Sequence, residues 1–112
     1  MKYKGVTMDN IDILEKIKTL LVNNYGNIIN KIILFGSRTD GTAREYSDYD
    51  ILIIVNSFID WRMKDELRSV IYDLNIEYDI LLSVQIISVE DLETPVGKQS
   101  FIQNAIDTGI AV

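Results

Sequence analysis

The chain has 112 residues, of which 47% are hydrophobic, and a formal net charge of −6. This size suits a single domain spanning residues 1–112, and the longest apolar run, Ile51–Val55, is far shorter than the roughly 18 residues of a membrane helix. Cysteine and histidine are absent, which excludes thiolate and imidazole chemistry, and the acidic charge argues against direct nucleic-acid binding, so we expect a cytoplasmic protein that works through carboxylates, hydroxyls and backbone groups.

The first half of the chain predicts a helix and two strands. Apolar residues at three- and four-residue spacing form one helix face that ends at Tyr25-Gly26; they are Met8, Ile11, Leu14, Ile17 and Leu21. A short β-branched run predicts a strand over Lys31–Phe35, and a polar loop follows over Gly36–Ser47. The continuous apolar run of Tyr49–Val55 predicts a second strand that is buried on both faces.

The second half predicts a helix, a third strand and a last helix. Ser57 or Asp60 can cap a helix that extends to about Asn75. Its inner face would consist of Met63, Leu67, Val70, Ile71 and Leu74. We expect the third strand over Glu77–Ile87 and the last helix over about Val96–Asp107.

Two local signals refine this second half. Ser88-Val89-Glu90-Asp91 resembles a helix start, with an acid three residues after the serine, and Gly109 is a candidate C-terminal cap of the last helix. The helix between the second and third strands predicts that this pair is parallel, whereas the loop between the first two can join them antiparallel. We therefore expect an α/β (α+β) fold with a small mixed sheet of three or four strands and helices packed against it.

Two carboxylates at the start of the second strand are the strongest candidates for a functional site. Asp48 and Asp50 are two residues apart, so on a strand they point to the same side, roughly 6–7 Å apart. An acid pair at this spacing suits Mg²⁺, which prefers oxygen ligands. Each feature alone also fits an ordinary turn, but Asp48-Tyr49-Asp50 follows Gly36-Ser37 across one loop between two apolar strands, which favours a site.

A phosphate-binding P-loop is a second interpretation of this loop. Gly36 and Gly41 are separated by four residues, as in that motif. The motif then requires Lys and Ser/Thr before a long helix, whereas this chain continues with Thr42-Ala43 and no helix pattern. The sequence therefore disfavours a P-loop.

The whole stretch from Leu34 to Ile53 resembles the DNA-polymerase-β-like nucleotidyltransferases. Gly-Ser, ten residues and then Asp-x-Asp is the signature of that superfamily, and the wider run is similar to its minimal nucleotidyltransferase group. The tail Phe101–Ile110 is also similar to that group, with Thr-Gly where Glu-Gly is usual. The resemblance implies a polymerase-β-like core, and the group includes small proteins paired with helical HEPN partners in toxin–antitoxin modules.

The resemblance also implies a chemistry and its residues. Members bind Mg²⁺, with two ions expected, and transfer AMP from ATP to a hydroxyl while pyrophosphate leaves. Asp48 and Asp50 match the catalytic metal-binding pair. Gly36 and Ser37 match the turn that holds the triphosphate, and Arg38 beside them can neutralise phosphate charge.

A third metal-binding and catalytic acid is expected on the next strand. Asp79 is the candidate, with Glu77 as the fallback, because Glu77, Asp79 and Leu81 would share one face of the strand predicted there. Some relatives carry an acid where Leu81 stands. If that position is the catalytic one, this chain lacks its base.

We expect a partner to present the acceptor, because only about 20 residues follow the third strand. The resemblance implies a HEPN protein whose tyrosine receives the AMP. Two alternatives stay open: an antitoxin with weak or no catalysis that acts by complex formation, and a transferase that modifies a small molecule or an RNA end with a second subunit.

Overall fold

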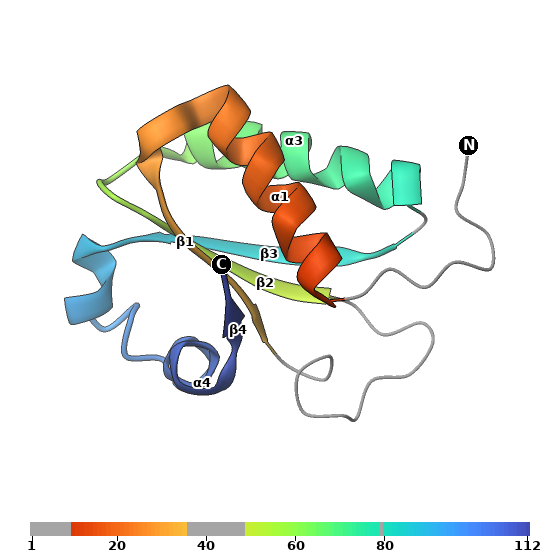
Figure 1. The fold of residues 1–112 in the computed structure, drawn as a ribbon. Helices are drawn as coiled ribbons and strands as arrows, with labels where there is room; N and C mark the ends of the chain where they lie inside the picture. Colours follow the sequence, from red (N-terminus) through yellow and green to blue (C-terminus); the bar gives the residue numbers. More distant parts are fainter. Residues whose placement is uncertain (1–9, 36–48, 79) are drawn as a thin grey trace.

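The computed structural model describes residues 10–35, 49–78 and 80–112. Figure 1 shows one four-stranded sheet between helices, with the strand order β3-β2-β1-β4. The helices are α1 (Asn10–Tyr25), α3 (Trp61–Tyr78) and α4 (Ser100–Thr108), the short 3₁₀ turns are η1 (Gly26–Ile28) and η2 (Glu90–Glu93), and the strands are β1 (Ile29–Phe35), β2 (Tyr49–Val55), β3 (Leu82–Ser88) and β4 (Ile110–Ala111).

The sheet is mixed, as the sequence predicts. β1 pairs antiparallel with β2, and β2 pairs parallel with β3 across the α3 connection. The two-residue strand β4 adds antiparallel to the free side of β1, where Leu34 pairs with Ile110. This pairing places the end of β1 and the starts of β2 and β3 at one end of the sheet.

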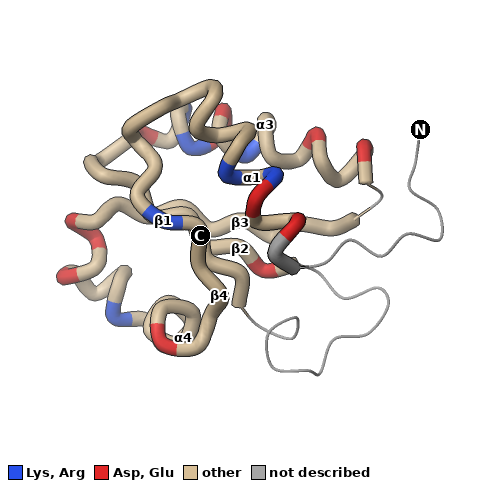
Figure 2. The backbone as a smooth tube through the Cα atoms, in the orientation of Figure 1, with Lys and Arg blue, Asp and Glu red and all other residues tan. Residues whose placement is uncertain are grey.

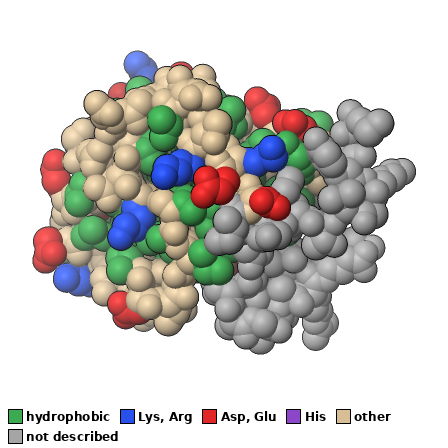
Figure 3. All heavy atoms as spheres, in the orientation of Figure 1, with side chains coloured by type: hydrophobic (Ala, Val, Ile, Leu, Met, Phe, Trp, Pro, Cys, Tyr) green, Lys and Arg blue, Asp and Glu red, His purple; other side chains and the backbone are tan. Residues whose placement is uncertain are grey.

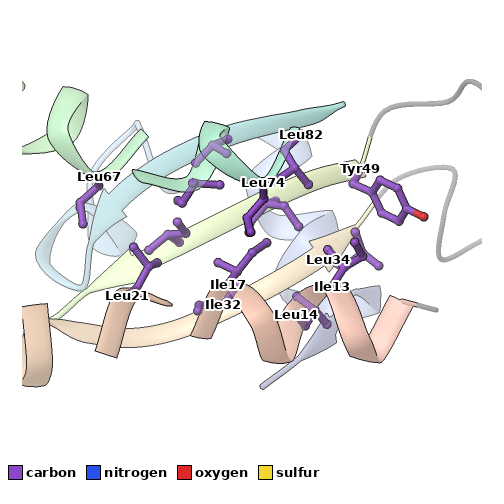
Figure 4. Packing of buried hydrophobic residues seen from close by; sticks show 14 of the residues in the cluster. Ile13, Leu14, Ile17, Leu21, Ile32, Leu34, Tyr49, Leu67, Leu74 and Leu82 are labelled. Carbon is purple, nitrogen blue, oxygen red and sulfur yellow. The ribbon is translucent and has the colours of Figure 1, made fainter. Parts of the chain in front are cut away.

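Two apolar clusters cover the two faces of the sheet. α1 and α3 pack on one face and α4 on the other (Figure 1). The larger cluster, shown in Figure 4, joins Ile17 and Leu21 of α1 and Leu67 and Leu74 of α3 to the sheet. The smaller cluster consists of Ile33, Leu52, Ile54, Ile87, Ile102 and Ala105. Between them they bury both faces of β2, which explains its continuous apolar run.

The ends of the first two helices follow local chemistry. α1 stops at Tyr25 because Gly26 adopts a φ of 60°, a conformation that other residues rarely take. The carboxylate of Asp60 accepts a hydrogen bond from the Met63 backbone N–H at 3.0 Å, so Asp60 is the cap of α3. Among the described helices, none is both long and apolar enough to span a membrane.

The boundary between α3 and β3 differs from the prediction. α3 continues to Tyr78, so Glu77 lies on a helix, and β3 begins only at Leu82. The prediction of a strand over Glu77–Ile87 was therefore wrong at its start. The side chain of Asn75 explains the shift, since it accepts a hydrogen bond from the Leu82 backbone N–H and joins the last turns of α3 to the first residue of β3.

In the C-terminal region the predicted capping bonds are present, but the last helix starts later than predicted. Ser88 and Asp91 exchange backbone-to-side-chain hydrogen bonds of 3.0 and 3.2 Å, the reciprocal pattern of a capping box, but the turn they start is the short η2. α4 begins at Ser100 rather than near Val96. Gly109 ends α4 with an ordinary negative φ, and a Cβ there would collide with the Ile33 side chain, so close packing is what requires a glycine.

Candidate active site

Of the predicted site residues, Asp50 lies within the described part of the chain, as does Glu77, the fallback for the third acid. Asp50 is the second residue of β2 and is partly buried, with Phe35 of β1 and Ser83 of β3 directly beside it in the sheet. Because alternate residues of a strand face the same side, Asp50 lies on the side of Leu52 and Ile54, which pack against α4. Its carboxylate therefore belongs to the α4 side, at the end of the sheet where β2 and β3 begin.

Asp50 has one neighbour on each adjacent strand, and one of them is apolar whereas the other is polar. Phe35 packs against the apolar cluster on the α4 side, while Ser83 is partly buried and carries a hydroxyl. Neighbouring strands lie about 4.7–4.9 Å apart, and side chains in register point to the same side, so Ser83 and Asp50 are neighbours on one side of the sheet. Sequence reasoning missed Ser83, because only the pairing of β2 with β3 identifies it as a neighbour of Asp50.

The other predicted site residues lie outside the described residues. They are Gly36, Ser37, Arg38, Asp48 and Asp79. Their described neighbours in the chain meet at one end of the sheet. Phe35 ends β1 next to Asp50, and Tyr49 begins β2 with its backbone N–H bonded to the Leu81 carbonyl at 2.8 Å. Strand pairing thus brings the end of β1, the start of β2 and the start of β3 together at the end of the sheet that carries Asp50.

The third acid has a different structural context from the one predicted. Glu77 is exposed on α3 and does not share a strand face with Leu81. The ladder from β2 reaches the Leu81 carbonyl, and by alternation Leu81 is on the same side of β3 as Ser83. Leu81 therefore stands just before β3, on the side that carries Ser83. Asp79 precedes this ladder, and its role stays a prediction.

Acidic side chains in the described part of the chain do not by themselves form a metal site around Asp50. Within residues 10–35, 49–78 and 80–112, no three acidic side chains are grouped closely enough to hold a metal ion. The charged residues of the described backbone are marked in Figure 2, where they are spread over both layers.

One described group away from this end has a perturbed pKa. Burial, followed by the negative charge of Glu66 and a hydrogen bond to it, raises the pKa of Tyr25 above its ordinary value of 10.0. Tyr25 ends α1, and β1 starts only four residues later at the opposite end from Phe35. This shift therefore concerns the packing of α1 against α3 and not the Asp50 region.

Comparison with known proteins decides the family. Residues 15–112 match the sequence profile of the family described as polymerase beta, nucleotidyltransferase. The chain belongs to this family. The fold agrees with a polymerase-β-like core, which confirms the predicted mixed sheet with helices on its faces.

Two relatives from Methanocaldococcus jannaschii are similar over much of the chain. The chain is 30% identical over 105 residues to a protein named "Putative protein adenylyltransferase MJ0141", covering 94% of this chain and 100% of the relative. It is 32% identical over 83 residues to "Putative protein adenylyltransferase MJ1305", covering 72% of this chain and 56% of that relative. Together with the family match, these similarities identify the chain as a nucleotidyltransferase.

Solved structures of toxin–antitoxin complexes have a similar fold. A toxin–antitoxin structure with AMP-PNP has a TM-score of 0.57 at 24% identity, with coverage of 87% of this chain and 69% of that chain. A mutant of the MntA–HpeT toxin–antitoxin complex has a TM-score of 0.55 at 25% identity, with coverage of 88% and 69%. These likenesses support the fold.

Proposed function

We propose that this chain is a Mg²⁺-dependent adenylyltransferase that moves AMP from ATP to a hydroxyl of a partner protein, a tyrosine of a HEPN-type protein. The observation that supports it most directly is the place of Asp50 at the end of the sheet where β1 ends and β2 and β3 begin, in a chain of the nucleotidyltransferase family. The names of the M. jannaschii relatives support a protein acceptor, and the AMP-PNP complex of a structural neighbour supports an ATP-like donor.

The reaction is a displacement at the α-phosphorus of ATP. The acceptor oxygen forms a bond to that phosphorus, the bond to the oxygen bridging the α- and β-phosphates breaks, and pyrophosphate leaves. The acceptor proton passes to a carboxylate, for which we propose Asp79. Mg²⁺, when bound, neutralises phosphate charge and makes the acceptor oxygen a better nucleophile.

The donor set of the chain suits that ion. Without histidine or cysteine, the ligands available are hard oxygens, which Mg²⁺ prefers. We propose that Asp48 and Asp50 hold the ions together with Asp79, while the Gly36-Ser37 turn and Arg38 bind the triphosphate. Two carboxylates close together oppose each other's ionisation, and this cost explains why such a pair would require a cation.

Leu81 supports one alternative function. It stands on the side of β3 that carries Ser83, where a third carboxylate would lie next to the row of Asp50. If that position is the one that catalysis requires, the chain is an antitoxin that acts by forming a complex, with weak or no catalysis. A transferase that modifies a small molecule or an RNA end finds less support, because the chain has a net charge of −6.

A thermal-shift titration with Mg²⁺ and ATP tests the site. Ligand at 100 times its Kd stabilises a protein by about 2.7 kcal/mol, which corresponds to a rise of roughly 10 °C for a domain of this size. We expect this rise in the wild type and in the exposed control Asp107→Asn, and not in Asp50→Asn. A metal-dependent rise that survives Asp50→Asn would contradict the site assignment.

Transfer of α-labelled AMP to the partner protein separates the two functions. Asp79→Asn should abolish transfer if Asp79 accepts the proton, whereas Leu81→Asp should leave transfer unchanged or impair it. A large gain of transfer in Leu81→Asp, with little loss in Asp79→Asn, would instead establish the incomplete site. In that case, neutralisation of a toxin by an Asp50→Asn variant should equal that of the wild type.

A further inference from the structure

The start of β3 carries accessible side chains on the side of the sheet that holds Asp50. Alternate residues along a strand share one side, so Leu81, just before β3, and Ser83 and Gln85 of β3 lie on the α4 side with Asp50. Leu81 is 58% exposed, Gln85 is exposed and Ser83 is partly buried. We call Leu81, Ser83 and Gln85 the β3 strip.

The residues beside the β3 strip are covered, whereas the strip is not. Leu52 of β2 is in register with Gln85 and is fully buried in one cluster with Ile102 and Ala105 of α4. The strand that α4 contacts most is β1, which is separated from β3 by β2, and Figure 1 shows α4 beneath β1 and β4. The exposed side chains of the strip therefore leave room for a ligand next to Asp50.

The β3 strip is uncharged. It combines an apolar side chain, a hydroxyl and an amide, and the sequence has no Lys or Arg between Ser69 and Gly97. By contrast, the face of the molecule in Figure 3, with α1 in front, carries Lys and Arg side chains among acidic and apolar ones. Phosphate groups are bound by cations and by clusters of backbone N–H groups. The strip therefore suits an uncharged part of a substrate and not a triphosphate.

The one described cation that bonds β3 is engaged at its edge. The Arg68 guanidinium of α3 donates to the Val84 carbonyl at 3.5 Å and pairs with Asp65 at 3.5 Å. α3 packs on the other face of the sheet, so these bonds do not bring positive charge to the β3 strip.

The Gln85 amide is available for a ligand. Among residues 10–35, 49–78 and 80–112, none hydrogen-bonds its side chain. An amide offers two N–H donors and a carbonyl acceptor, which can pair with a peptide group of another protein. Leu81 and Gln85 are four residues apart, or about 13 Å along a strand, which is enough for one aromatic side chain and a neighbouring peptide group.

The order of the strands indicates which reactant meets the β3 strip. Phe35 of β1 and Ser83 of β3 flank Asp50 on opposite sides. In the proposed function the triphosphate is bound by the Gly36-Ser37 turn, which follows Phe35 in the chain. The attacking and leaving oxygens lie roughly in line during displacement at phosphorus. Pyrophosphate would then leave toward β1, and the acceptor would approach from β3.

We propose that the β3 strip binds the acceptor tyrosine, with Leu81 against its ring and the Gln85 amide bonded to an adjacent peptide group, so that the phenol oxygen lies next to Asp50. This inference rests on the proposed function, because it assigns residues to the acceptor of that reaction. A serine or threonine has a hydroxyl but no ring to cover Leu81, so the strip selects tyrosine. In this role Leu81 contacts the acceptor and does not mark a missing base.

Nuclear magnetic resonance of isotope-labelled protein tests the β3 strip without ATP. The probe is N-acetyl-tyrosinamide, which has an uncharged peptide group on each side of the tyrosine. The matched probe, N-acetyl-serinamide, keeps the hydroxyl and lacks the ring. Each is titrated into the wild type, Leu81→Ser and Gln85→Ala.

Two control variants match these substitutions. Phe58→Ser removes an apolar side chain that is 69% exposed, three residues beyond the end of β2 that is opposite Asp50. Asn23→Ala removes an exposed amide from α1, which packs on the other face of the sheet. Leu81 and Gln85 are exposed, so all four variants should keep the wild-type spectrum away from the substitution.

We expect N-acetyl-tyrosinamide to shift the backbone N–H signals of Ser83 and Gln85 and not that of Phe58. Leu81→Ser and Gln85→Ala should each weaken its binding about ten-fold, a change of 1.4 kcal/mol, while both controls bind as the wild type does. N-acetyl-serinamide should bind the wild type about ten-fold more weakly. Equal affinity for the two probes, equal affinity in all variants, or no shift at the strip would each overturn the proposal.

Transfer of AMP to N-acetyl-tyrosinamide, followed by mass spectrometry, gives a kinetic readout. Leu81→Ser and Gln85→Ala should raise the KM for this acceptor about ten-fold and leave the KM for ATP unchanged. A raised KM for ATP with an unchanged KM for the acceptor would assign the strip to the nucleotide and overturn the proposal.

Failure of this inference and failure of the proposed function give different results. A Mg²⁺- and ATP-dependent thermal shift in a protein whose β3 strip does not respond to N-acetyl-tyrosinamide refutes this inference alone. Binding of the probe at the strip in a protein without that thermal shift refutes the proposed function and leaves a tyrosine-binding site on β3.

Discussion

Asn75→Ala should loosen the join between α3 and β3 without touching the core. The Asn75 side-chain oxygen accepts the backbone N–H of Leu82, and this bond is partly buried. After the substitution, that N–H has lost its acceptor at the first residue of the strand that pairs with Tyr49 and Asp50. The change therefore tests whether Asn75 sets the start of β3.

The expected loss combines two opposing terms. A partly buried donor without an acceptor costs about 1–3 kcal/mol. Alanine is the better helix former, which returns roughly 0.5 kcal/mol within α3. The net decrease in the free energy of unfolding is then about 1–2 kcal/mol, or a fall in Tm of roughly 4–8 °C for a domain of this size.

Urea unfolding followed by circular dichroism measures this loss, and Asn24→Ala is the matched control. Asn24 is also near the end of a helix, but its side chain bonds only the Leu20 carbonyl of the same exposed turn, at 2.7 Å. The gain in helix propensity is the same in both variants, so their difference isolates the bond between α3 and β3. A difference below about 0.5 kcal/mol, within the range of ordinary surface substitutions, would refute this role of Asn75.

Three further changes test packing and titration. Ile102 of α4 is 1% exposed, so Ile102→Ala should lower the free energy of unfolding in urea by about 2–5 kcal/mol. Ile106 is 39% exposed on the same helix, so Ile106→Ala should lower it much less. Equal losses would contradict the packing of α4. Gly109→Ala forces a side chain against its neighbours and should cost about 1–3 kcal/mol, whereas a neutral result would exclude that close approach. Because burial and Glu66 raise the pKa of Tyr25, the folded chain holds that proton more tightly than the unfolded chain does. This stability is complete below pH 10.0 and falls as the pH rises through the folded pKa, so Tyr25→Phe should flatten the alkaline decrease, and an unchanged decrease would count against it.

Much of the fold could be predicted from the sequence because local pattern and strand burial agree there. The continuous apolar run of Tyr49–Val55 identified the central strand with its observed bounds. The helix ends at Tyr25 and at the Asp60 cap follow from a glycine and a short acidic side chain. The parallel pairing of β2 and β3 follows from the length of the connection between them.

The α3–β3 boundary could not be predicted in this way. The alternation at Glu77, Asp79 and Leu81 fits a strand. The helix nevertheless continues to Tyr78, and the Leu82 backbone N–H, seven residues after Asn75, donates to the Asn75 side chain. β4 is only two residues long and depends on pairing with Leu34 of β1, so no local pattern predicts it. Tertiary contacts override weak local preference where the segment is short.

The sequence determines which residue types the candidate site can use, whereas the tertiary structure determines which residues lie next to Asp50. The spacing of Gly36-Ser37 and Asp48-x-Asp50 identified the family, because that chemistry needs those residue types at fixed separations along two strands. Strand register alone places Ser83 beside Asp50 and aligns Leu81 with the same side of β3. The physical reason is that hydrogen bonds between strands join residues more than thirty positions apart, and periodicity within one strand carries no information about that pairing.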